Sequence, residues 1–475
     1  MAQDIVINGA TYPDTPGLSV PKSGGGSAYF PDTSGDTVTA NVLQQGYTAH
    51  DASGQPITGT MTPGGGGAVP SDDVIFYDYD GTRLYSYSAA EFAALSSMPA
   101  NPSHSGLTAQ GWNWTLADAK TYVASYGKLN IGQMYVTDDG KTRLYITIAA
   151  KGRMTVPLYF SQTVANGVTI DWGDESVTET LSETGNVSTS HTYSSIGDYV
   201  ITLSPSSGCT LGLGKGMSSY CVLGATGITG RVYTNMLQKV EVGSNVTSIS
   251  AYAFQYCYSL ASITIPSTVT SIATYTFYYC YSLASITIPS SVTSIDTDAF
   301  YYCYSLASIT IPSSVTTIGN YAFSYCNALA SITIPSSVTS IGTYVFSDCC
   351  SLASITIPST VTSIGQNAFY NCNSLASITI PSTVTSIGTY AFCNCYSLAS
   401  ITIPSTVTSI GTYAFSSCCG VSEYHIKRTS PPTLSNKNAF GNIPSDCKIY
   451  VPSNSLSIYK SASNWSNYAS YMVGE

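Results

Sequence analysis

The sequence predicts a mainly β fold whose second half is a solenoid of eight 23-residue units, preceded by a β-sandwich and a small α+β module. Three observations carry this prediction. The chain from Leu237 to Gly420 superimposes on itself when it is shifted by 23 residues. Most units contain a Ser-Ile-Thr-Ile segment, which has the alternation of a strand with one buried face. A fixed period of this kind is typical of proteins in which each repeat stacks on the next.

Each unit is predicted to form one coil of the solenoid. Ile263 and Ile265 form a short strand, which Pro266 ends because proline has no N–H for a ladder. Val269 and Ile272 are expected to turn inward on an irregular segment. Burying the apolar side chains of one unit stabilises it by less than the ordering of its backbone costs. A single unit therefore cannot fold alone, and stacked units must share their apolar faces.

The spacing Leu-x-x-Ile-x-Ile-Pro resembles a leucine-rich repeat, and Ser-Ile-Thr-Ile-Pro-Ser-x-Val-Thr-Ser-Ile-Gly-x-x-Ala-Phe-x-x-Cys is similar to the BspA-like branch of that family. The resemblance covers residues 237–420 and implies a leucine-rich-repeat solenoid. Thr268, Ser291 and Ser314 stand where the wider family has asparagine, so a hydroxyl ladder is expected there. Residues 421–475 resemble the closing cap of the same family, and residues 206–236 are assigned to the N-terminal cap.

Eight cysteines fall in one column of the repeat, from Cys257 to Cys418. Metal or redox chemistry is one interpretation, but Cys-x-x-Cys pairs with zinc spacing are absent and no histidine joins the column. The favoured interpretation is a ladder of small buried thiols that packs between turns. The sequence therefore predicts no metal site, no cofactor and no catalytic residue.

The positions that flank the Phe and Cys columns change from turn to turn, while the rest of the unit is nearly constant. Tyr, Asn, Ser, Asp and Cys replace one another there, which indicates exposure to solvent. Tyr, Ser and Asn also dominate antibody paratopes, where tyrosine gives a large contact area at low entropy cost. Neutral drift on an indifferent surface is the alternative to diversification for binding. The predicted ligand-binding residues are Tyr256, Tyr258, Tyr278, Tyr279, Tyr281, Tyr301, Tyr302, Tyr304, Tyr325, Asn327, Tyr370, Asn371, Asn373, Asn394 and Tyr396.

Residues 1–70 are predicted to be an N-terminal attachment region with glycine runs at 24–26 and 64–67, which are typical of linkers. The sequences of residues 42–47 and 54–61 together resemble a small module of phage and prophage tail proteins. Residues 107–116 also resemble prophage structural proteins of gut bacteria.

Residues 71–150 are predicted to be a small α+β module. Two hairpins with Asp-Gly turns are expected over 74–85 and 134–145, with two helices between them. Ser88 and Thr115 are the expected helix caps, and Gly127 the expected end of the second helix. The turn aspartates are assigned to turn formation rather than to calcium, because a twelve-residue ligand loop with its closing glutamate is missing.

Residues 151–205 contain short strands, and residues 168–174, 191–193 and 197–203 are similar to a PKD-type β-sandwich. The resemblance implies a spacer domain with Trp172 in its core. Glu175 stands where that family usually has glycine, which puts the turn there in question. His191 and Asp174 suggest a catalytic pair, but no nucleophile or oxyanion-hole motif accompanies them. Both are therefore assigned a structural role.

The charge pattern excludes several classes of function. With 16 Lys+Arg against 26 Asp+Glu the net charge is −10, and no basic block is present that would follow a phosphate backbone, so no nucleic-acid partner is expected. Between Asn245 and Gly420 the charged residues are Asp296, Asp298 and Asp348. This composition is unlike the paired carboxylates of a glycan-cleaving enzyme, so the protein is not expected to be an enzyme. No stretch approaches the roughly 18 apolar residues of a membrane span, so no membrane insertion is expected.

These observations favour a non-catalytic, fibre-like tail protein of a phage or prophage, whose solenoid binds the surface of the host bacterium. The expected partners are a glycan or protein of that surface and other tail proteins of the virion, and the sequence leaves open whether the chain forms a homotrimer. No secretory signal is visible at the N-terminus, so synthesis in the bacterial cytoplasm and assembly into the virion are expected. The alternative is a BspA-like adhesin of a bacterial cell surface that binds a host protein or glycan. The sequence leaves open whether the strand face or the variable columns make the contact.

Overall fold

The computed structural model describes residues 73–216, 220–225 and 235–475, and the backbone of six short strands within the first 58 residues. The chain divides into two compact units, Met1–Pro70 and Ser71–Glu475. The strands of the first unit form three antiparallel pairs: β1 (Ile5–Ile7) with β2 (Ala10–Tyr12), β3 (Leu18–Pro21) with β4 (Ser27–Phe30), and β5 (Thr48–His50) with β6 (Pro56–Thr58). The rest of the predicted attachment region lies outside the described residues.

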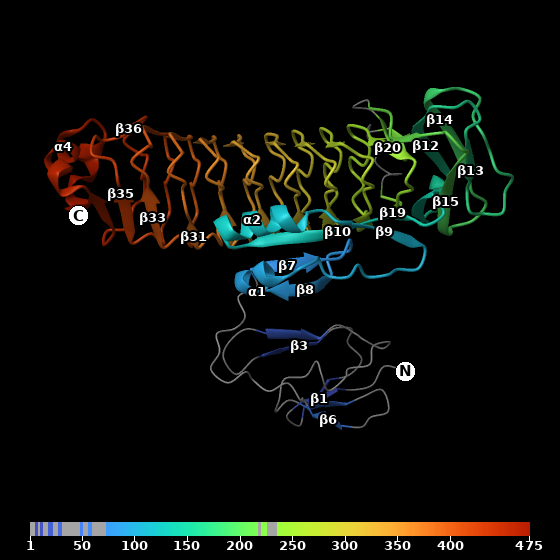
Figure 1. The fold of residues 1–475 in the computed structure, drawn as a ribbon, viewed down its shortest axis with the longest axis horizontal. Helices are drawn as coiled ribbons and strands as arrows, with labels where there is room; N and C mark the ends of the chain where they lie inside the picture. Colours follow the sequence, from blue (N-terminus) through green and yellow to red (C-terminus); the bar gives the residue numbers. More distant parts are fainter. Residues whose placement is uncertain are drawn as a thin grey trace. The chain divides into compact units, whose positions relative to one another are not determined.

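The second unit begins with a four-stranded sheet and two helices (Figure 1). The strand order is β8 (Arg83–Tyr87), β7 (Val74–Tyr77), β10 (Leu129–Thr137) and β9 (Leu107–Trp112), with β10 parallel to β7. Helices α1 (Ala89–Ala94) and α2 (Leu116–Tyr126) begin at the predicted caps, Ser88 and Thr115, and Gly127 ends α2 with a φ of +81°. The first predicted hairpin and both helices are confirmed. Strand β9 was not predicted.

The second predicted hairpin, over residues 134–145, is wrong. β10 and β11 (Thr142–Ile148) belong to different sheets and do not pair. The stretch of β10 that the hairpin would use pairs with β9 through residues 133–137, and β11 finds its partners elsewhere. It pairs with β15 (Gly197–Pro205) and with β19 (Leu237–Glu241).

A two-sheet sandwich leads directly into the solenoid. One sheet has the order β13 (Val168–Asp171), β15, β11, β19 and β21 (Ser262–Ile263); the other has β14 (Gly185–Thr192), β12 (Thr155–Gln162), β16 (Leu211–Leu213) and β20 (Val246–Ile249). The sandwich predicted for residues 151–205 thus includes β11 and shares both sheets with the first solenoid turns. Trp172, the predicted core residue, is 2% exposed. Glu175 has a φ of +64°, so the turn in question does require the conformation that glycine adopts most readily.

Each solenoid coil contributes to two parallel ladders, which confirms the predicted fold class. The Ser-Ile-Thr strands of the first ladder pair in register across the 23-residue step. The Ser-Ile segment nine residues further on forms a second parallel ladder, so the expectation of an irregular segment around Ile272 is wrong. Between the ladders, the buried Phe column stacks with ring centroids 5.2–5.7 Å apart.

The first ladder continues from β21 through β23 (Ser285–Thr287), β25 (Ser308–Thr310), β27 (Ser331–Thr333), β29 (Ser354–Thr356), β31 (Ser377–Ile378) and β33 (Ser400–Ile403). The second ladder contains β20, β22 (Ser271–Ile272), β24 (Ser294–Ile295), β26 (Thr317–Ile318), β28 (Ser340–Ile341), β30 (Ser363–Ile364), β32 (Ser386–Ile387), β34 (Ser409–Ile410) and β36 (Thr433–Leu434). A short hairpin, β17 (Tyr220–Cys221) with β18 (Gly224–Ala225), precedes both ladders.

Two side-chain ladders predicted from the repeat are confirmed. In the hydroxyl column, Ser314 Oγ donates to the carbonyl of Val292 at 2.7 Å, and the same contact recurs from Thr268 to Thr406. The column thiols are at most 1% exposed. The Cys303 thiol, for example, donates to the carbonyl of Phe277 at 3.2 Å. The cysteines therefore pack and hydrogen-bond within the core.

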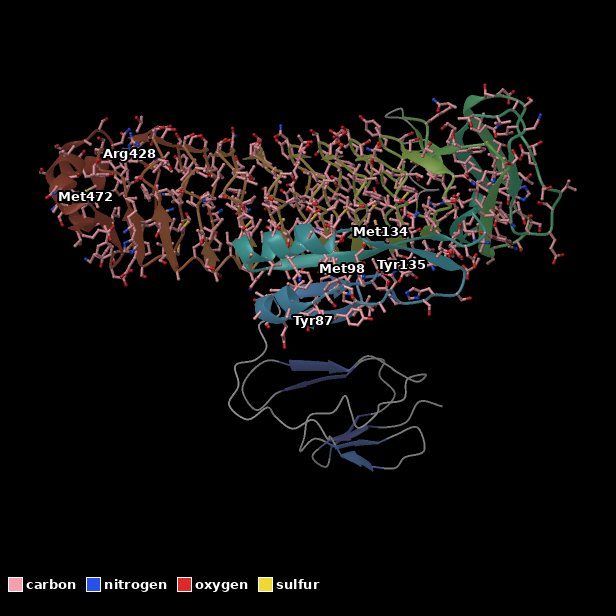
Figure 2. All side chains as sticks on the ribbon, viewed as in Figure 1. Tyr87, Met98, Met134, Tyr135, Arg428 and Met472 are labelled. Atoms are coloured by element: carbon pink, nitrogen blue, oxygen red, sulfur yellow. The ribbon has the colours of Figure 1, made fainter. Side chains whose placement is uncertain are left out.

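The predicted closing cap contains further coils of the first ladder. Strands β35 (Glu423–Ile426), β37 (Lys448–Val451) and β38 (Met472–Gly474) continue it beyond residue 420. The end of the core is closed by α4 (Leu456–Ser461) and the short 3₁₀ segment Trp465–Tyr471. Figure 2 shows Arg428 and Met472 at this end of the solenoid. Trp465 is 1% exposed and packs on Phe440, the last ring of the Phe column.

Candidate functional site

The strand face of the solenoid is partly occupied by the α+β module of the same chain. β10 lies along it, against β23, β25 and β27 (Figure 1). A Cβ on Gly132 would lie 2.2 Å from Thr310 Oγ1, so glycine permits this close approach. The hydroxyl residues beneath the module are 2–7% exposed: Thr264, Ser285, Thr287, Thr310 and Thr333. This part of the face is therefore closed to a partner.

Buried polar side chains anchor the module to the ends of the strands. Asn113 Nδ2 donates to the carbonyls of Ile288 and Thr310, at 3.0 and 3.2 Å. Trp114 Nε1 donates to the carbonyl of Ile311 at 2.9 Å, and Tyr122 Oη to that of Ile334 at 2.7 Å.

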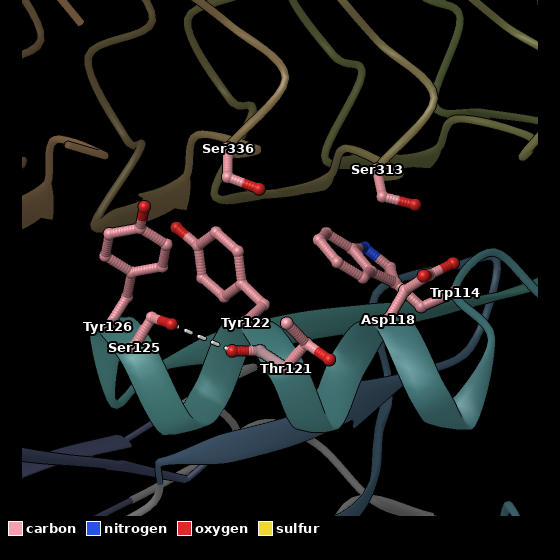
Figure 3. Close-up of a pocket in the computed structure, with 8 residues that line it drawn as sticks. All are labelled: Trp114, Asp118, Thr121, Tyr122, Ser125, Tyr126, Ser313 and Ser336. Atoms are coloured by element: carbon pink, nitrogen blue, oxygen red, sulfur yellow. Dashed lines mark hydrogen bonds between the residues drawn. The ribbon is translucent and has the colours of Figure 1, made fainter. Parts of the chain in front are cut away.

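Figure 3 shows the aromatic side chains of this anchor pointing from α2 and its N-terminal turn toward the solenoid. They line a small cavity of about 150 Å³ that also includes Ser313 and Ser336. Burial raises the pKa of Tyr122, so its hydroxyl stays a donor at neutral pH. The cavity thus lies at the contact between the module and the solenoid.

Beyond the module, the strand face is open to solvent. Ser377, Thr379, Ser400 and Thr402 are all exposed. The open stretch ends at an ion-pair cluster, in which the Glu475 carboxylate lies 2.9 Å from His425 Nδ1 and 2.7 Å from Lys427 Nζ.

The predicted binding residues do gather on one surface, in three columns: two at the variable positions inside the Phe-x-x-Cys motif and one directly after its cysteine. We call these columns the tyrosine edge: the first runs from Gln255 to Ser416, the second from Tyr256 to Ser417 and the third from Tyr258 to Cys419, each in steps of 23 residues. Neighbouring rings of the second column have centroids 4.3–5.4 Å apart, up to Tyr325. Those of the third are 4.8–5.0 Å apart, up to Tyr304. Whether these residues bind a ligand stays a prediction.

Toward the C-terminus the tyrosine edge changes from rings to amides. Asn371 Nδ2 donates to Asp348 Oδ1 at 2.7 Å, and Asn394 Nδ2 donates to Asn371 Oδ1 at 2.8 Å. Asn327 lies in the third column with its buried Oδ1 lacking a hydrogen-bond partner. The remaining predicted residues of this part are Tyr370, Asn373 and Tyr396, of which Tyr396 is 47% exposed.

The second column has a left-handed backbone at every turn. Its φ angles lie between +58° and +63° from Tyr256 to Ser417. A left-handed conformation costs an L-residue about 1–2 kcal/mol, and Asn and Asp tolerate it best. Asp348, Asn371 and Asn394 fit that preference, whereas the four tyrosines do not. The left-handed backbone therefore explains part of the variability in this column, since it favours Asn and Asp. The tyrosines occupy the column against this conformational preference.

A fourth aromatic column was missed by the sequence reasoning. It runs from Tyr252 to Tyr413 in 23-residue steps, also with left-handed φ angles of +55° to +65°. Tyr321 and Tyr344 stack with centroids 4.6 Å apart, and Tyr390 and Tyr413 at 4.9 Å. The signal was present in the repeat, because tyrosine recurs at this position.

The first, second and fourth columns enclose a pocket of about 570 Å³. Its lining residues are Tyr301, Tyr321, Ser324, Tyr325, Tyr344, Ser347, Asp348, Gln366, Asn367, Tyr370 and Tyr390. Burial raises the pKa of Tyr325 to about 12, and the Asp348 carboxylate adds to the shift. The Tyr325 phenol is thus neutral at physiological pH.

The aspartates singled out from the sequence lie in turns, and His191 lies in strand β14. His191 Nε2 is 2.7 Å from Asp174 Oδ2, and its ring stacks on Trp172. Asp80 accepts the N–H of Thr82, and Asp139 accepts that of Lys141 and pairs with Arg143. These contacts fit the structural roles expected for the aspartates. No three His, Cys, Asp or Glu side chains of the described part of the chain converge as a metal site requires.

Residues 232–352 and 341–469 match the protein family described as "BspA type Leucine rich repeat region (6 copies)". The chain belongs to the BspA-type leucine-rich repeat family. Together the two matches span half of the chain and confirm the resemblance seen in the repeats. No sequence among the curated proteins matches.

Similar solved structures are also leucine-rich repeat proteins. A leucine-rich repeat protein from Bacteroides ovatus is 26% identical, with 47% of this chain and 63% of that chain covered and a TM-score of 0.38. A leucine rich cell surface protein from Faecalibacterium prausnitzii is 33% identical, covering 43% and 63%, with a TM-score of 0.32. The T. pallidum leucine-rich repeat protein is 34% identical, covering 32% and 71%, with a TM-score of 0.29. The chain thus spans less than two thirds of the first two.

The family match starts at residue 232, so the PKD-like and tail-protein resemblances of the preceding residues stay predictions. The matched family is a repeat family rather than an enzyme family, and repeat solenoids typically present extended binding surfaces. Among the described residues, no helix has both the length and the apolar character needed to cross a bilayer.

Proposed function

We propose that this BspA-type protein is a non-catalytic binding protein of a bacterial cell surface, which adheres to a host protein or glycan through its tyrosine edge. The observation that carries this proposal is that the α+β module covers part of the strand face, which is the other candidate binding surface. The module buries Thr264, Ser285, Thr287, Thr310 and Thr333 of the strand face, whereas the tyrosines of the tyrosine edge in the same turns are half-buried or exposed. The serines and the glutamine of the first column are buried between them, so the exposure expected from variability holds for the rings and not for that whole column.

The strained backbone of the tyrosine edge supports the same choice. Tyr279, Tyr302 and Tyr325 occupy left-handed positions where the later turns carry Asp or Asn. Residues held in unfavourable backbone conformations concentrate at functional sites. Tyrosine also gives a large, rigid contact area, which is the property that antibody paratopes use.

The charges of the solenoid define the partner's chemistry. Between Asn245 and Gly420 the chain has three aspartates and no Lys, Arg or His. Such a surface repels phosphates and other anions, and it suits a neutral or cationic partner.

The sequence first favoured a virion tail protein, which would use the same binding surface. The match to the BspA-type family supports the cell-surface alternative instead. Detection of the chain on intact bacterial cells by antibody would agree with the proposal. Recovery of the chain in purified phage particles, with none on cells, would contradict it.

The binding test uses the labelled full chain on cultured epithelial cells and gut bacterial cells, each with and without periodate or protease treatment. The key variant is the triple change Tyr279→Asn, Tyr302→Asn and Tyr325→Asn, since asparagine already occupies this column at 371 and 394. We expect the variant to fold and to lose adhesion. Periodate sensitivity would indicate a glycan, and protease sensitivity a protein.

The matched control is Thr379→Val with Thr402→Val, on the open part of the strand face. We expect this control to adhere like the native chain. Adhesion that survives the tyrosine changes and is lost with the threonine changes would move the binding surface to the strand face. A folded native chain that adheres to no cell type would contradict the proposed function itself.

A further inference from the structure

The pocket of the tyrosine edge exists because the first column lacks a ring at two successive turns. Tyr278 and Tyr301 stack with centroids 5.3 Å apart, but Ser324 and Ser347 follow before Tyr370 restores the ring. The fold does not demand serine here, since the same position holds tyrosine in three turns. Two missing rings leave the space of about 570 Å³, which is within the range of small-molecule sites.

Two of the lining residues carry buried polar atoms without partners. Ser324 is 1% exposed and Asn367 is 5% exposed. Neither Ser324 Oγ nor Asn367 Oδ1 has a hydrogen-bond partner within the protein. A buried polar group without a partner is costly, and native structures contain few of them. Both atoms are closed to solvent, so a ligand in the pocket must find its hydrogen-bond acceptor among the more exposed lining groups.

The negative charge at the pocket favours a ligand with a cationic hydrogen-bond donor. Asp348 lines the pocket, and its carboxylate accepts hydrogen bonds from Ser347 Oγ at 2.6 Å and Asn371 Nδ2 at 2.7 Å. Both donors are neutral, and no Lys, Arg or His lies between residues 245 and 420. The field of this carboxylate reaches the pocket walls, because it contributes to the raised pKa values of Tyr325 and Tyr370.

We infer that this pocket binds an organic cation, a guanidinium or alkylammonium group, with Asp348 as its counter-ion and tyrosine rings as its walls. Tyrosine rings attract cations through their π faces, and a guanidinium both stacks on rings and presents several N–H donors. The half-buried Asp348 carboxylate is the acceptor that such a group would meet. The inference rests on the proposed adhesion and deepens it, since it names the chemistry that one point of the tyrosine edge recognises.

The first experiment compares ligand probes on the full chain by isothermal titration calorimetry at low salt. N-acetyl-arginine amide is expected to bind, and N-acetyl-citrulline amide, which has nearly the same shape without the charge, to bind at least tenfold more weakly. Tighter binding of the arginine probe than of choline would point to an arginine side chain of a partner protein. The reverse order would point to a small quaternary ammonium compound. Equal binding of the arginine and citrulline probes would overturn the inference.

Three variants locate the site. Ser324→Tyr with Ser347→Tyr completes the ring column and is expected to abolish binding of the arginine probe. Asp348→Asn keeps a side chain that this column already carries at 371 and is expected to weaken binding about tenfold or more. Asp296→Asn removes a solenoid carboxylate outside the pocket lining and is the control, with unchanged binding.

Other results would overturn the inference without touching the proposed function. Undiminished binding to the filled variant would place the cation elsewhere. Saturable binding of methyl β-glucoside in place of the arginine probe would assign the pocket to a neutral sugar. Binding of no probe, together with native adhesion to cells, would refute the cation site and leave the adhesive role of the tyrosine edge in place.

Discussion

At the residue scale, backbone conformation limits which side chains the variable columns accept. Two columns of the solenoid have a left-handed φ at nearly every turn, and non-glycine residues occupy all of these positions. The local preference of the backbone for Asn and Asp therefore accounts for some of the substitutions seen between turns, Tyr to Asn, Asp or Ser. Tyrosine stands in the column against that preference, as the contact surface that we propose for it would require.

The cost of a left-handed residue can be measured at Glu175, which has a φ of +64° and an exposed side chain. We expect Glu175→Gly to raise the free energy of unfolding by about 0.5–1 kcal/mol, because the relief of strain exceeds the entropy that glycine loses. The measurement is a urea titration. Glu175→Ala is the matched control, since it removes the same charge and keeps the strain. Equal stability of the two variants would show that the turn is not strained.

Burial also controls the chemistry of the thiols. Twelve of the fourteen cysteines are buried, Cys350 is half-buried and Cys419 is exposed. Burial raises the pKa of the column thiols, so they lack the thiolate that reacts with disulfide reagents. We expect a thiol-exchange reagent at pH 8 to label Cys419 rapidly in the native protein, Cys350 more slowly and the column only after denaturation. Rapid native labelling of the column would contradict the closed core.

At the element scale, the docking of β10 on the solenoid depends on the absence of a side chain at Gly132. Its Cβ would meet Thr310 Oγ1 at 2.2 Å and Thr287 Oγ1 at 2.5 Å. We expect Gly132→Ala to destabilise the native state by about 1–3 kcal/mol through overpacking and to loosen this contact. Hydrogen exchange should then accelerate in β10, β23 and β25.

The control for this prediction is Gly152→Ala, because an added Cβ there would meet no atom within 4 Å. It should leave stability and exchange unchanged. Native-like exchange in Gly132→Ala would mean that the module can shift on the strand face at little cost, and that this face can be opened to partners.

The elements differ in how far the sequence could predict them. The strand at Ile263, the hydroxyl column at Ser314 and the thiol column at Cys303 were predictable, because each buried contact recurs at a fixed step and the repeat displays it many times. The hairpin over residues 134–145 failed because strand pairing depends on which edges are already occupied. An Asp-Gly turn does not reveal this.

The candidate site was predictable only in part. The tyrosine columns followed from variation within the repeat. The closure of the strand face did not, because Asn113 and Thr310 are far apart in sequence and belong to unrelated patterns. The pocket depends on two serines replacing tyrosine in adjacent turns, a difference that becomes a cavity only when the coils stack in register.

At the scale of the whole molecule, the described part of the chain buries phenols in all its parts, which makes its stability sensitive to alkaline pH. Burial raises the pKa of Tyr145 in the sandwich to about 12, and likewise of Tyr281 and Tyr325 in the solenoid. An unfolded tyrosine titrates near 10. The stability that these groups contribute is therefore fully present below pH 10 and is lost as the pH rises toward 12, because the unfolded chain releases its protons first.

We expect the tyrosinate absorbance at 295 nm to rise in two steps. Exposed tyrosines should titrate near pH 10, and the remainder should titrate cooperatively between pH 10 and 12 with loss of the far-ultraviolet circular dichroism. Removing the Tyr281 and Tyr325 phenols, in a Tyr281→Asn, Tyr325→Asn variant, should move the unfolding midpoint to higher pH, since fewer protons are released on unfolding. A single titration near pH 10 with unchanged circular dichroism would show that the stacked phenols are open to water. The rigid aromatic surface that the proposed adhesion requires would then be absent.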